Sequence, residues 1–120
     1  MSGELAFVEI GVDDVERGRV FYEGLFGWKL ETGPSGQGYT ISMPNVGGGM
    51  HGGDKGAAPY LFFRVDDIDQ AVERVKELGG TVDDVDVDSD EDSVAQHGRF
   101  KLCRDDQGSP FGLHQPPLPM

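Results

Sequence analysis

Two charged side chains interrupt apolar segments of this sequence and are its first candidates for chemistry. Glu9 lies in the segment 6–12 and Arg64 in the segment 59–65. Alternate residues of a strand share one face, so both charges would lie on the face opposite the one that packs against a helix. If that face points into the protein interior, a charge on it costs free energy unless it forms an ion pair or takes part in binding or catalysis. Either Glu9 and Arg64 pair with each other, or Glu9 is a general base of raised pKa while Arg64 orients an anionic or carbonyl group.

Other reactive residue types are few. Cys103 is the one cysteine, which excludes an intrachain disulfide and a Cys/His zinc cluster, and its neighbours predict a half-buried strand residue. Seven acids lie between Asp83 and Asp92, without the glycine and closing glutamate of a calcium loop. We interpret this run as an outer strand leading into a solvated loop, with weak cation binding as the alternative.

The composition and net charge of the chain disfavour some classes of binding partner. The 120 residues fit one domain, and 22 acids against 10 bases give a net charge of -12. Such a surface disfavours nucleic acids and anionic membranes, so neither is an expected partner. The start of the chain lacks the basic and apolar regions of a signal peptide, and we expect a cytoplasmic protein.

The elements that must position these residues appear twice. At an offset of 53 residues, Val12-Asp13-Asp14 matches Val65-Asp66-Asp67. Each copy predicts a short strand, an Asp-Asp turn and a helix that ends in glycine, with Asp66 or Asp67 as the second helix cap. The apolar stripe of the second helix is Ile68, Ala71, Val72, Val75 and Leu78. That of the first is Val15, Gly18, Tyr22 and Leu25, widened by Phe21 and Phe26.

A second match has an offset of 63 residues. Gly49-Met50-His51-Gly52 corresponds to Gly112-Leu113-His114-Gln115, and strands are predicted before each copy at 39–43 and 100–103. The chain therefore consists of two copies of a β-α-β-β-β module with loops of unequal length.

These features resemble the vicinal oxygen chelate superfamily of glyoxalase, bleomycin-resistance and extradiol-dioxygenase proteins, and its small glyoxalase-like members most. The match rests on segments 7–14, 21–29, 65–71, 77–80 and 104–113. It implies an α+β fold of one domain, 1–120, in which two βαβββ modules, about 5–53 and 58–116, form a cupped half-barrel sheet pair around one cavity. It also implies a homodimer.

The resemblance places the metal ligands of relatives at Phe7, Gly49, Tyr60 and Gly112 of this sequence. Phenylalanine and glycine side chains cannot ligate, and one tyrosine cannot hold a labile metal, so we expect no cofactor. Two residues beyond these positions, Glu9, His51 and His114 would form a two-histidine, one-carboxylate set for a divalent metal, which stays an alternative.

Alternation within the implied fold also predicts a cavity wall that binds a small-molecule ligand. Its members are Phe7, Glu9, Trp28, Tyr39, Met43, Met50, Tyr60, Phe62, Arg64 and Phe100. We expect the cavity to bind a small hydrophobic or aromatic molecule, as in antibiotic sequestration. The alternatives are a glyoxalase-like lyase or isomerase that uses Glu9 or the metal set, and an accessory domain in which these residues are only core. Whether the chain is an enzyme stays open.

Overall fold

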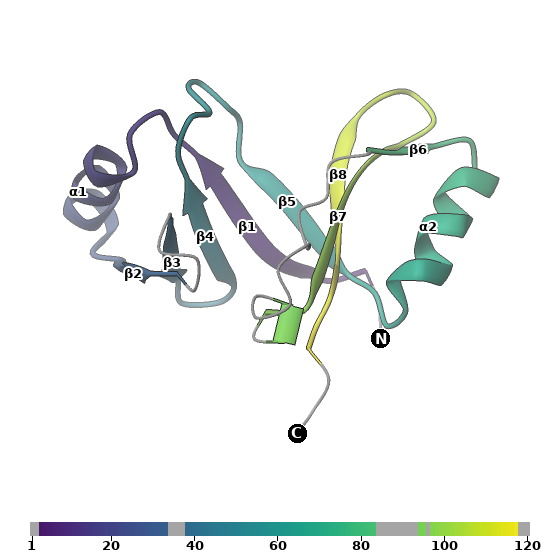
Figure 1. Cartoon of the computed structure of the whole chain (residues 1–120), viewed down its shortest axis with the longest axis horizontal. Helices are drawn as coiled ribbons and strands as arrows, with labels where there is room; N and C mark the ends of the chain where they lie inside the picture. Colours follow the sequence, from purple (N-terminus) through teal and green to yellow (C-terminus); the bar gives the residue numbers. More distant parts are fainter. Residues whose placement is uncertain (1–2, 34–37, 84–93, 96, 118–120) are drawn as a thin grey trace. The chain divides into compact units, whose positions relative to one another are not determined.

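The computed structural model describes residues 3–33, 38–83, 94–95 and 97–117. Its contacts divide the chain into two compact units, each described by itself below. The N-terminal unit is Phe7–Tyr60, and the C-terminal unit is Leu61–Met120 together with Met1–Ala6. Each unit carries one βαβββ module (Figure 1), which confirms the predicted α+β class and the duplication. The cavity expected between the modules stays a prediction.

The N-terminal module runs from β1 (Leu5–Gly11) through α1 (Val15–Phe26) to β2 (Lys29–Thr32), β3 (Tyr39–Ser42) and β4 (Gly47–His51). Its strands follow the order β2-β3-β4-β1. β1 and β4 are parallel and adjacent, with Glu9 opposite Gly49 and Gly11 opposite His51. This pairing decides which side chains can meet in the site described below.

Local sequence explains where α1 begins and what it covers. The Asp14 carboxylate accepts hydrogen bonds from the backbone N–H groups of Glu16 and Arg17 at 3.0 and 3.2 Å, which caps the helix. At the other end Gly27 adopts a left-handed φ of 72°, a conformation that favours glycine. The buried core is Ile10, Leu30, Ile41 and Met50, with Val8, Val12, Val15, Tyr22, Trp28, Tyr39 and Met43 packed against it.

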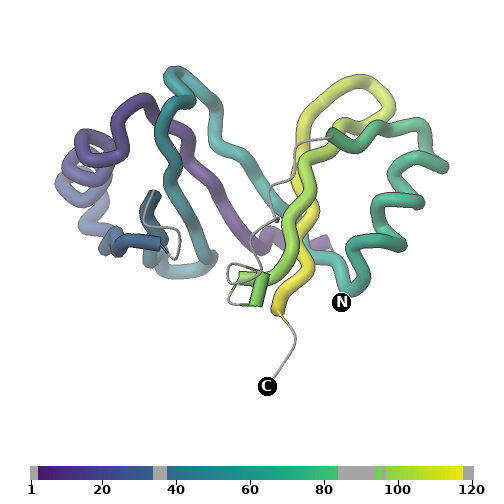
Figure 2. Tube along the Cα trace, viewed as in Figure 1, coloured from purple at the N-terminus to yellow at the C-terminus, as the bar shows by residue number. Residues whose placement is uncertain are grey.

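The C-terminal module contains β5 (Tyr60–Arg64), α2 (Ile68–Glu77), β6 (Thr81–Val82), β7 (Arg99–Arg104) and β8 (Pro110–Gln115). Its strands follow the order β5-β8-β7-β6, and the chain trace shows β7 and β8 running side by side as an antiparallel pair (Figure 2). β5 and β8 are parallel, with Phe62 opposite Gly112 and Arg64 opposite His114. The same first-to-last strand pairing therefore occurs in both modules.

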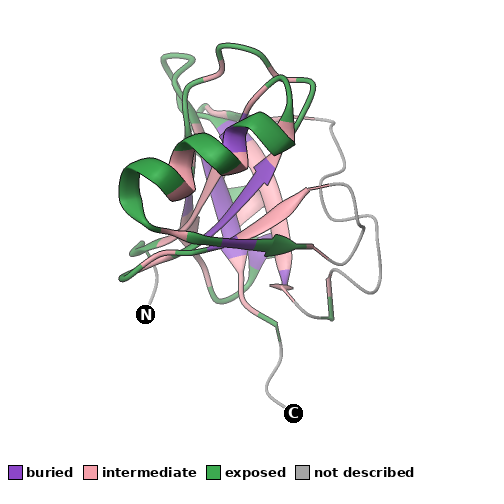
Figure 3. Ribbon diagram, turned by 90° about the vertical axis from the view of Figure 1, so that its left-hand side faces the viewer, coloured by how far each residue is buried: buried purple, intermediate pink, exposed green. Residues whose placement is uncertain are grey.

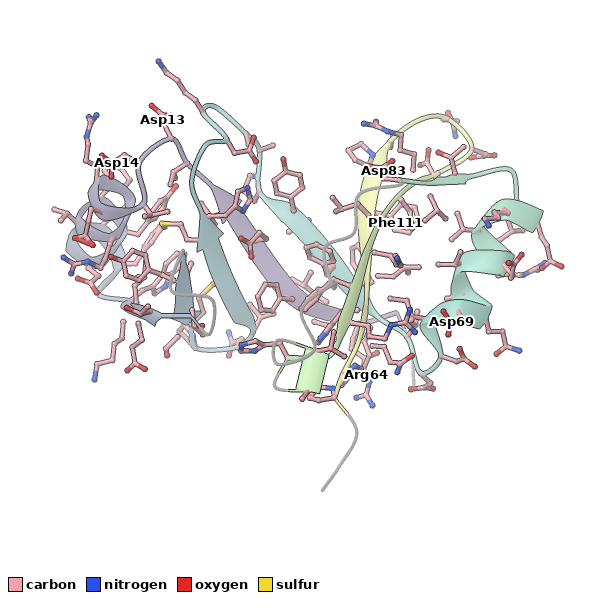
Figure 4. All side chains as sticks on the ribbon, in the orientation of Figure 1. Asp13, Asp14, Arg64, Asp69, Asp83 and Phe111 are labelled. Carbon is pink, nitrogen blue, oxygen red and sulfur yellow. The ribbon has the colours of Figure 1, made fainter. Side chains whose placement is uncertain are left out.

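A second core fills the space under α2. Ile68, Cys103 and Leu113 are buried, and Phe111 packs against them from the side of β8 that faces α2 (Figure 4). Asp67 caps α2, because its carboxylate accepts from the Gln70 N–H at 3.1 Å. Cys103 is only 1% exposed, more buried than the sequence predicted, and burial raises the pKa of its thiol to about 11.

Five residues that the sequence predicts to face inward are exposed in the structure. In α1, Val15, Gly18 and Tyr22 face the core, but Leu25, Phe21 and Phe26 are 59%, 60% and 56% exposed. Apolar residues cover a wider part of this helix than the core does, so periodicity alone cannot tell which of them are covered. Leu78, which follows the last residue of α2, is 62% exposed. The alternation that puts Arg64 on the strand face away from the helix also predicts that Leu61 faces the helix, but Leu61 is 43% exposed.

In the described residues, no helix is both long enough and apolar enough to cross a membrane. The acidic run is outside the described residues from 84 to 92. Asp83, at its start, donates its backbone N–H to the Leu102 carbonyl at 2.8 Å.

Candidate functional site

Four polar side chains of the N-terminal unit form one connected hydrogen-bonded cluster, which we call the Glu9–His51 cluster. Glu9 Oε2 lies 2.6 Å from His51 Nδ1, and the other ring nitrogen, Nε2, lies 2.7 Å from Asp54 Oδ2. The Tyr60 hydroxyl donates to the same Asp54 oxygen at 2.8 Å. The imidazole therefore lies between two carboxylates, and an uncharged phenol supports the second of them.

The parallel pairing of β1 with β4 places Glu9 and His51, and a short turn returns Asp54 to them. Val12 N–H donates to the His51 carbonyl at 2.9 Å, and Asp54 N–H donates to the Val12 carbonyl at 3.0 Å. The turn passes through Gly53, whose φ of 67° favours glycine. The end of β1 thus fixes both His51 and the loop that carries Asp54.

Two glycines leave the space that the cluster occupies. A Cβ atom on Gly49 would lie 2.5 Å from Glu9 Oε1, and one on Gly11 would lie 2.9 Å from both His51 Nε2 and the Asp54 carboxyl carbon. Real Cβ atoms do not approach other atoms so closely. Any larger residue at either position would displace a carboxylate from His51.

The cluster is partly exposed, and its groups shift each other's proton affinity. Burial raises the pKa of Glu9 above 4.5, more than the hydrogen bond and charge of His51 lower it. Burial lowers the pKa of His51, but the hydrogen bonds and charges of Glu9 and Asp54 outweigh it and raise that pKa above 6.5. Hydrogen bonds from His51 and Tyr60 lower the pKa of Asp54. The carboxylate of Glu9 and the imidazole of His51 are thus hydrogen-bonded to each other, and the pKa of each is raised. Such a pair suits acid–base chemistry near neutral pH.

One oxygen of the Glu9 carboxylate lies above the backbone of Gly49, where there is no side chain. Glu9 Oε2 is engaged by His51, whereas Oε1 lies over Gly49 and has no hydrogen-bond partner among the described residues. The Glu9 side chain is 25% exposed. Oε1 is therefore the atom of the cluster best placed to take a proton from, or return one to, a bound molecule.

The residues present do not fit the metal ions that relatives of the resembled superfamily hold. The implied ligand positions include Gly49 and Gly112, where added side chains would run into the Glu9 carboxylate and the Phe62 ring. Glu9 and His51 of the alternative set are in contact. However, Glu9 and Asp54 occupy opposite ring nitrogens of His51, so neither nitrogen is left to bind a metal ion beside a carboxylate. His114 belongs to the C-terminal unit, where its Nε2 donates to the His97 carbonyl at 2.7 Å. The described residues contain no group of three or more His, Cys, Asp or Glu side chains arranged for a metal.

The other predicted wall residues fall into two groups. In the N-terminal unit, Met50 belongs to the buried core, and Trp28, Tyr39 and Met43 are partly buried and pack against it. In the C-terminal unit, Phe62 meets Phe100 edge to face at a centroid distance of 5.2 Å, and Phe100 stacks on His114 at 4.3 Å. Phe7 lies against the glycines of β4, 3.2 Å from a Cβ on Gly49. The part these residues play in binding stays a prediction.

Glu9 and Arg64 each have partners within their own unit. Glu9 bonds to His51, while Arg64 ends β5 where the chain turns toward α2 (Figure 4). The Arg64 guanidinium lies 3.8 Å from Glu4 and 3.9 Å from Asp66, which are solvent-exposed ion pairs of little energetic weight. Of these two residues, Glu9 therefore has the shorter and more buried polar contact, and it is the better candidate for a functional role.

Asp54 is a member of the cluster that the sequence patterns above did not predict. Tyr60 was predicted only as an implied metal position and a wall residue. The available signal was the spacing of His51-Gly52-Gly53-Asp54, since a glycine turn returns a carboxylate to the histidine three residues before it.

Comparison with known proteins defines the class. Residues 4–112 match the family model of the Glyoxalase/Bleomycin resistance protein/Dioxygenase superfamily, and the chain belongs to that superfamily. A search of curated protein sequences found no match.

Solved structures share the fold at low sequence identity. Methylmalonyl-CoA epimerase from Mycobacterium tuberculosis is 19% identical with a TM-score of 0.66, over 97% of this chain and 89% of that one. A hypothetical protein from Bacillus halodurans C-125 is 14% identical with a TM-score of 0.68, over 100% and 99% of the two chains. A catechol 2,3-dioxygenase is 18% identical with a TM-score of 0.67, over 98% of this chain but 40% of that one.

Proposed function

We propose that this chain is a proton-transfer enzyme of the isomerase or lyase type, with Glu9 as its general acid–base. The observation that carries the proposal is the contact of 2.6 Å between Glu9 Oε2 and His51 Nδ1, which leaves Oε1 open above Gly49. The expected substrate is a small carbonyl compound with an acidic C–H bond next to the carbonyl group. The structural likeness to a methylmalonyl-CoA epimerase agrees with this class of reaction.

Each member of the Glu9–His51 cluster has a distinct role in the proposed step. Glu9 Oε1 accepts the proton from the carbon, and the electron pair of the broken C–H bond moves to the carbonyl oxygen as an enolate forms. His51 donates to Oε2 and holds the carboxylate in place throughout. Asp54 orients the imidazole and stabilises its charge, as a carboxylate does for a catalytic histidine elsewhere. Return of the proton from Glu9 to a neighbouring carbon on the same face of the enolate completes an isomerisation.

Deuterium exchange into a panel of small 2-hydroxy, 2-keto and thioester compounds, followed by proton NMR in D2O, tests this function. The wild type is expected to exchange at least one substrate, and Glu9→Gln to lose about 100-fold or more of the rate, the range of a general base. Glu31→Gln is the matched control, because Glu31 is an exposed acid of β2 outside the cluster. Equal exchange by wild type and Glu9→Gln for every substrate that reacts would refute the proposal.

A second candidate is ligand binding without turnover, including sequestration of a hydrophobic antibiotic. The observation that favours it is the aromatic group of Phe62, Phe100 and His114 in the C-terminal unit. A thermal-shift screen of aromatic compounds separates the two functions, because a ligand at 100 times its Kd raises the free energy of unfolding by ~2.7 kcal/mol. Sequestration predicts that Glu9→Gln keeps the shift and Phe100→Ala loses it.

A further inference from the structure

The sheet of the N-terminal unit has one face that α1 covers and one that α1 does not cover. The core residues of the sheet lie on the covered face, and Figure 3 shows α1 in front of the sheet, with buried and intermediate strand residues behind it. Because side chains alternate along a strand, the residues between the core positions point to the opposite face. Glu9, which lies between Val8 and Ile10, is one of them. The side chains of this second face are therefore the neighbours of the proposed base.

The register of the strands identifies the nearest of these neighbours. Gly49 of β4 lies directly opposite Glu9 of β1 and, on its other side, directly opposite Thr40 of β3. Directly paired residues of a sheet point to the same face, so these three residues form one row across three strands. Gly49 has no side chain, and the Glu9 carboxylate extends into the space above it. Thr40 is therefore the next side chain in the row beyond Glu9 Oε1.

The separation of Glu9 and Thr40 suits a small group between them. Paired Cβ positions on neighbouring strands are about 5 Å apart. Glu9 Oε1 lies 2.5 Å from the Cβ position of Gly49, on the row that leads to Thr40. An acidic C–H and the carbonyl group attached to it can bridge such a gap, because the C–H can face Oε1 while the carbonyl oxygen comes within hydrogen-bond distance of the threonine hydroxyl.

The Thr40 hydroxyl can act as the donor in this arrangement. It has no hydrogen-bond partner among the described residues, and the side chain is half-buried rather than enclosed. Its Oγ1 lies 3.8 Å from the Cβ position of Gly33, a second glycine, on β2's side of the strand. With Gly33 on one side and Gly49 on the other, the hydroxyl has room to rotate about χ1 toward either glycine.

The proposed reaction needs a donor that the Glu9–His51 cluster does not supply. When a proton leaves the carbon, the electron pair moves onto the carbonyl oxygen, and a donor aimed at that oxygen stabilises the enolate. Both ring nitrogens of His51 bond to carboxylates, and the Tyr60 hydroxyl donates to Asp54. The donors of the cluster are thus engaged, so the donor for the enolate oxygen has to come from another residue of the same face.

We propose that Thr40 is the hydrogen-bond donor to the enolate oxygen in the reaction of Glu9, an inference that rests on the proposed function. The substrate lies over Gly49, with its acidic C–H facing Glu9 Oε1 and its carbonyl oxygen facing Thr40. As Glu9 takes the proton, the electron pair moves to that oxygen, and the Thr40 O–H donates a hydrogen bond to it while keeping its own proton. The row therefore selects compounds whose carbonyl group is attached directly to the carbon that loses the proton.

The test is Thr40→Val, which removes the hydroxyl and keeps a branched side chain of similar size. In the D2O exchange assay, with dihydroxyacetone and pyruvate as probes, Thr40→Val is expected to lose about 100-fold of the rate, the effect of removing one oxyanion donor. Thr40→Ser keeps a hydroxyl donor and should retain most of the rate. Thr32→Val is the matched control, because Thr32 is paired with Tyr39 of the core and so points to the face that α1 covers.

A binding measurement tests Thr40 apart from turnover. Acetohydroxamate is a planar, neutral compound whose carbonyl and N–OH oxygens lie side by side, as the two oxygens of an enediol do. In NMR titrations its Kd is expected to be about 10-fold higher for Thr40→Val than for wild type, as for one lost hydrogen bond, and unchanged for Thr32→Val. The His51 ring protons should titrate equally in these three proteins, which shows that the cluster is intact.

The two assays separate this inference from the proposed function. If Glu9→Gln loses exchange while Thr40→Val keeps the wild-type rate, Thr40 is not the donor and the proposed function stands. Equal Kd values of acetohydroxamate for wild type and Thr40→Val would also overturn the inference. If Glu9→Gln exchanges every probe as fast as wild type, or wild type exchanges none, the proposed function fails and this inference fails with it.

Discussion

The substitution Gly49→Ala should break the contact between Glu9 and His51 without unfolding the protein. The new Cβ would lie 2.5 Å from Glu9 Oε1, whereas an unstrained contact of carbon with oxygen needs about 3.3 Å. The carboxylate must therefore retreat by roughly 0.8 Å. A hydrogen bond of 2.6 Å that lengthens by this amount passes beyond the 3.2 Å limit of a good one.

The cost in stability is small because the displaced group is the end of a flexible side chain. A hydrogen bond to a charged group contributes ~1.5–3 kcal/mol when buried, but the His51 side chain is 39% exposed and solvent screening reduces this. We expect Gly49→Ala to lower the free energy of unfolding by about 1 kcal/mol. The larger effect is on His51, whose pKa should fall toward its ordinary value of 6.5 once the Glu9 partner is lost.

The assay is an NMR titration of the His51 ring protons in wild type, Gly49→Ala and Gly47→Ala. Gly47 is a matched control on the same strand, because a Cβ there would meet only Phe7 at an ordinary 3.5 Å. Gly47→Ala should leave the pKa of His51 unchanged. An equal pKa of His51 in the two alanine variants would refute the reasoning that Gly49 exists to admit the Glu9 carboxylate.

Three further outcomes follow from the geometry. The pKa of His51 is raised on folding, so its pairing stabilises the fold fully below pH 6.5 and less as the pH rises through the folded-state pKa. In urea titrations, the difference in the free energy of unfolding between wild type and His51→Gln should therefore shrink as the pH rises through that pKa. Gly112→Ala drives a Cβ into the ring of buried Phe62 and should lower the free energy of unfolding by about 1–3 kcal/mol in the same assay. The buried Cys103 thiol, with its pKa of about 11, should resist iodoacetamide at neutral pH and react fully in denaturant, as mass spectrometry would show.

Helix caps and apolar periodicity in the sequence predicted the helices and strands, because each of these patterns depends on residues that are neighbours in the chain. Asp67 caps α2, and the stripe that begins at Ile68 covers the second core, as the sequence indicated. The face of α1 was mispredicted at Phe21 and Leu25, since the apolar residues of this helix extend well beyond one narrow stripe. Deciding between its faces requires knowledge of what packs on each.

The Glu9–His51 cluster was predicted only in part for a different reason. Alternation put Glu9 on the strand face away from the helix, and the repeat of residues 49–52 at 112–115 drew attention to His51. Their meeting depends on the register of two parallel strands that are 40 residues apart in sequence. The spacing of His51 and Asp54 indicates a turn between them, but the place of Asp54 also depends on the hydrogen bond from its N–H to the Val12 carbonyl, which that spacing does not specify.

The glycines of the last strands let the two halves of a duplicated protein diverge. In each module that glycine faces the residue two positions past the first-strand site, Glu9 in one half and Phe62 in the other. The space beside each glycine thus accommodates an acid in one copy and an aromatic ring in the other. A glycine at the same place in both copies leaves room on the neighbouring strand, and the two halves of the duplicated fold fill that room with side chains of different chemistry.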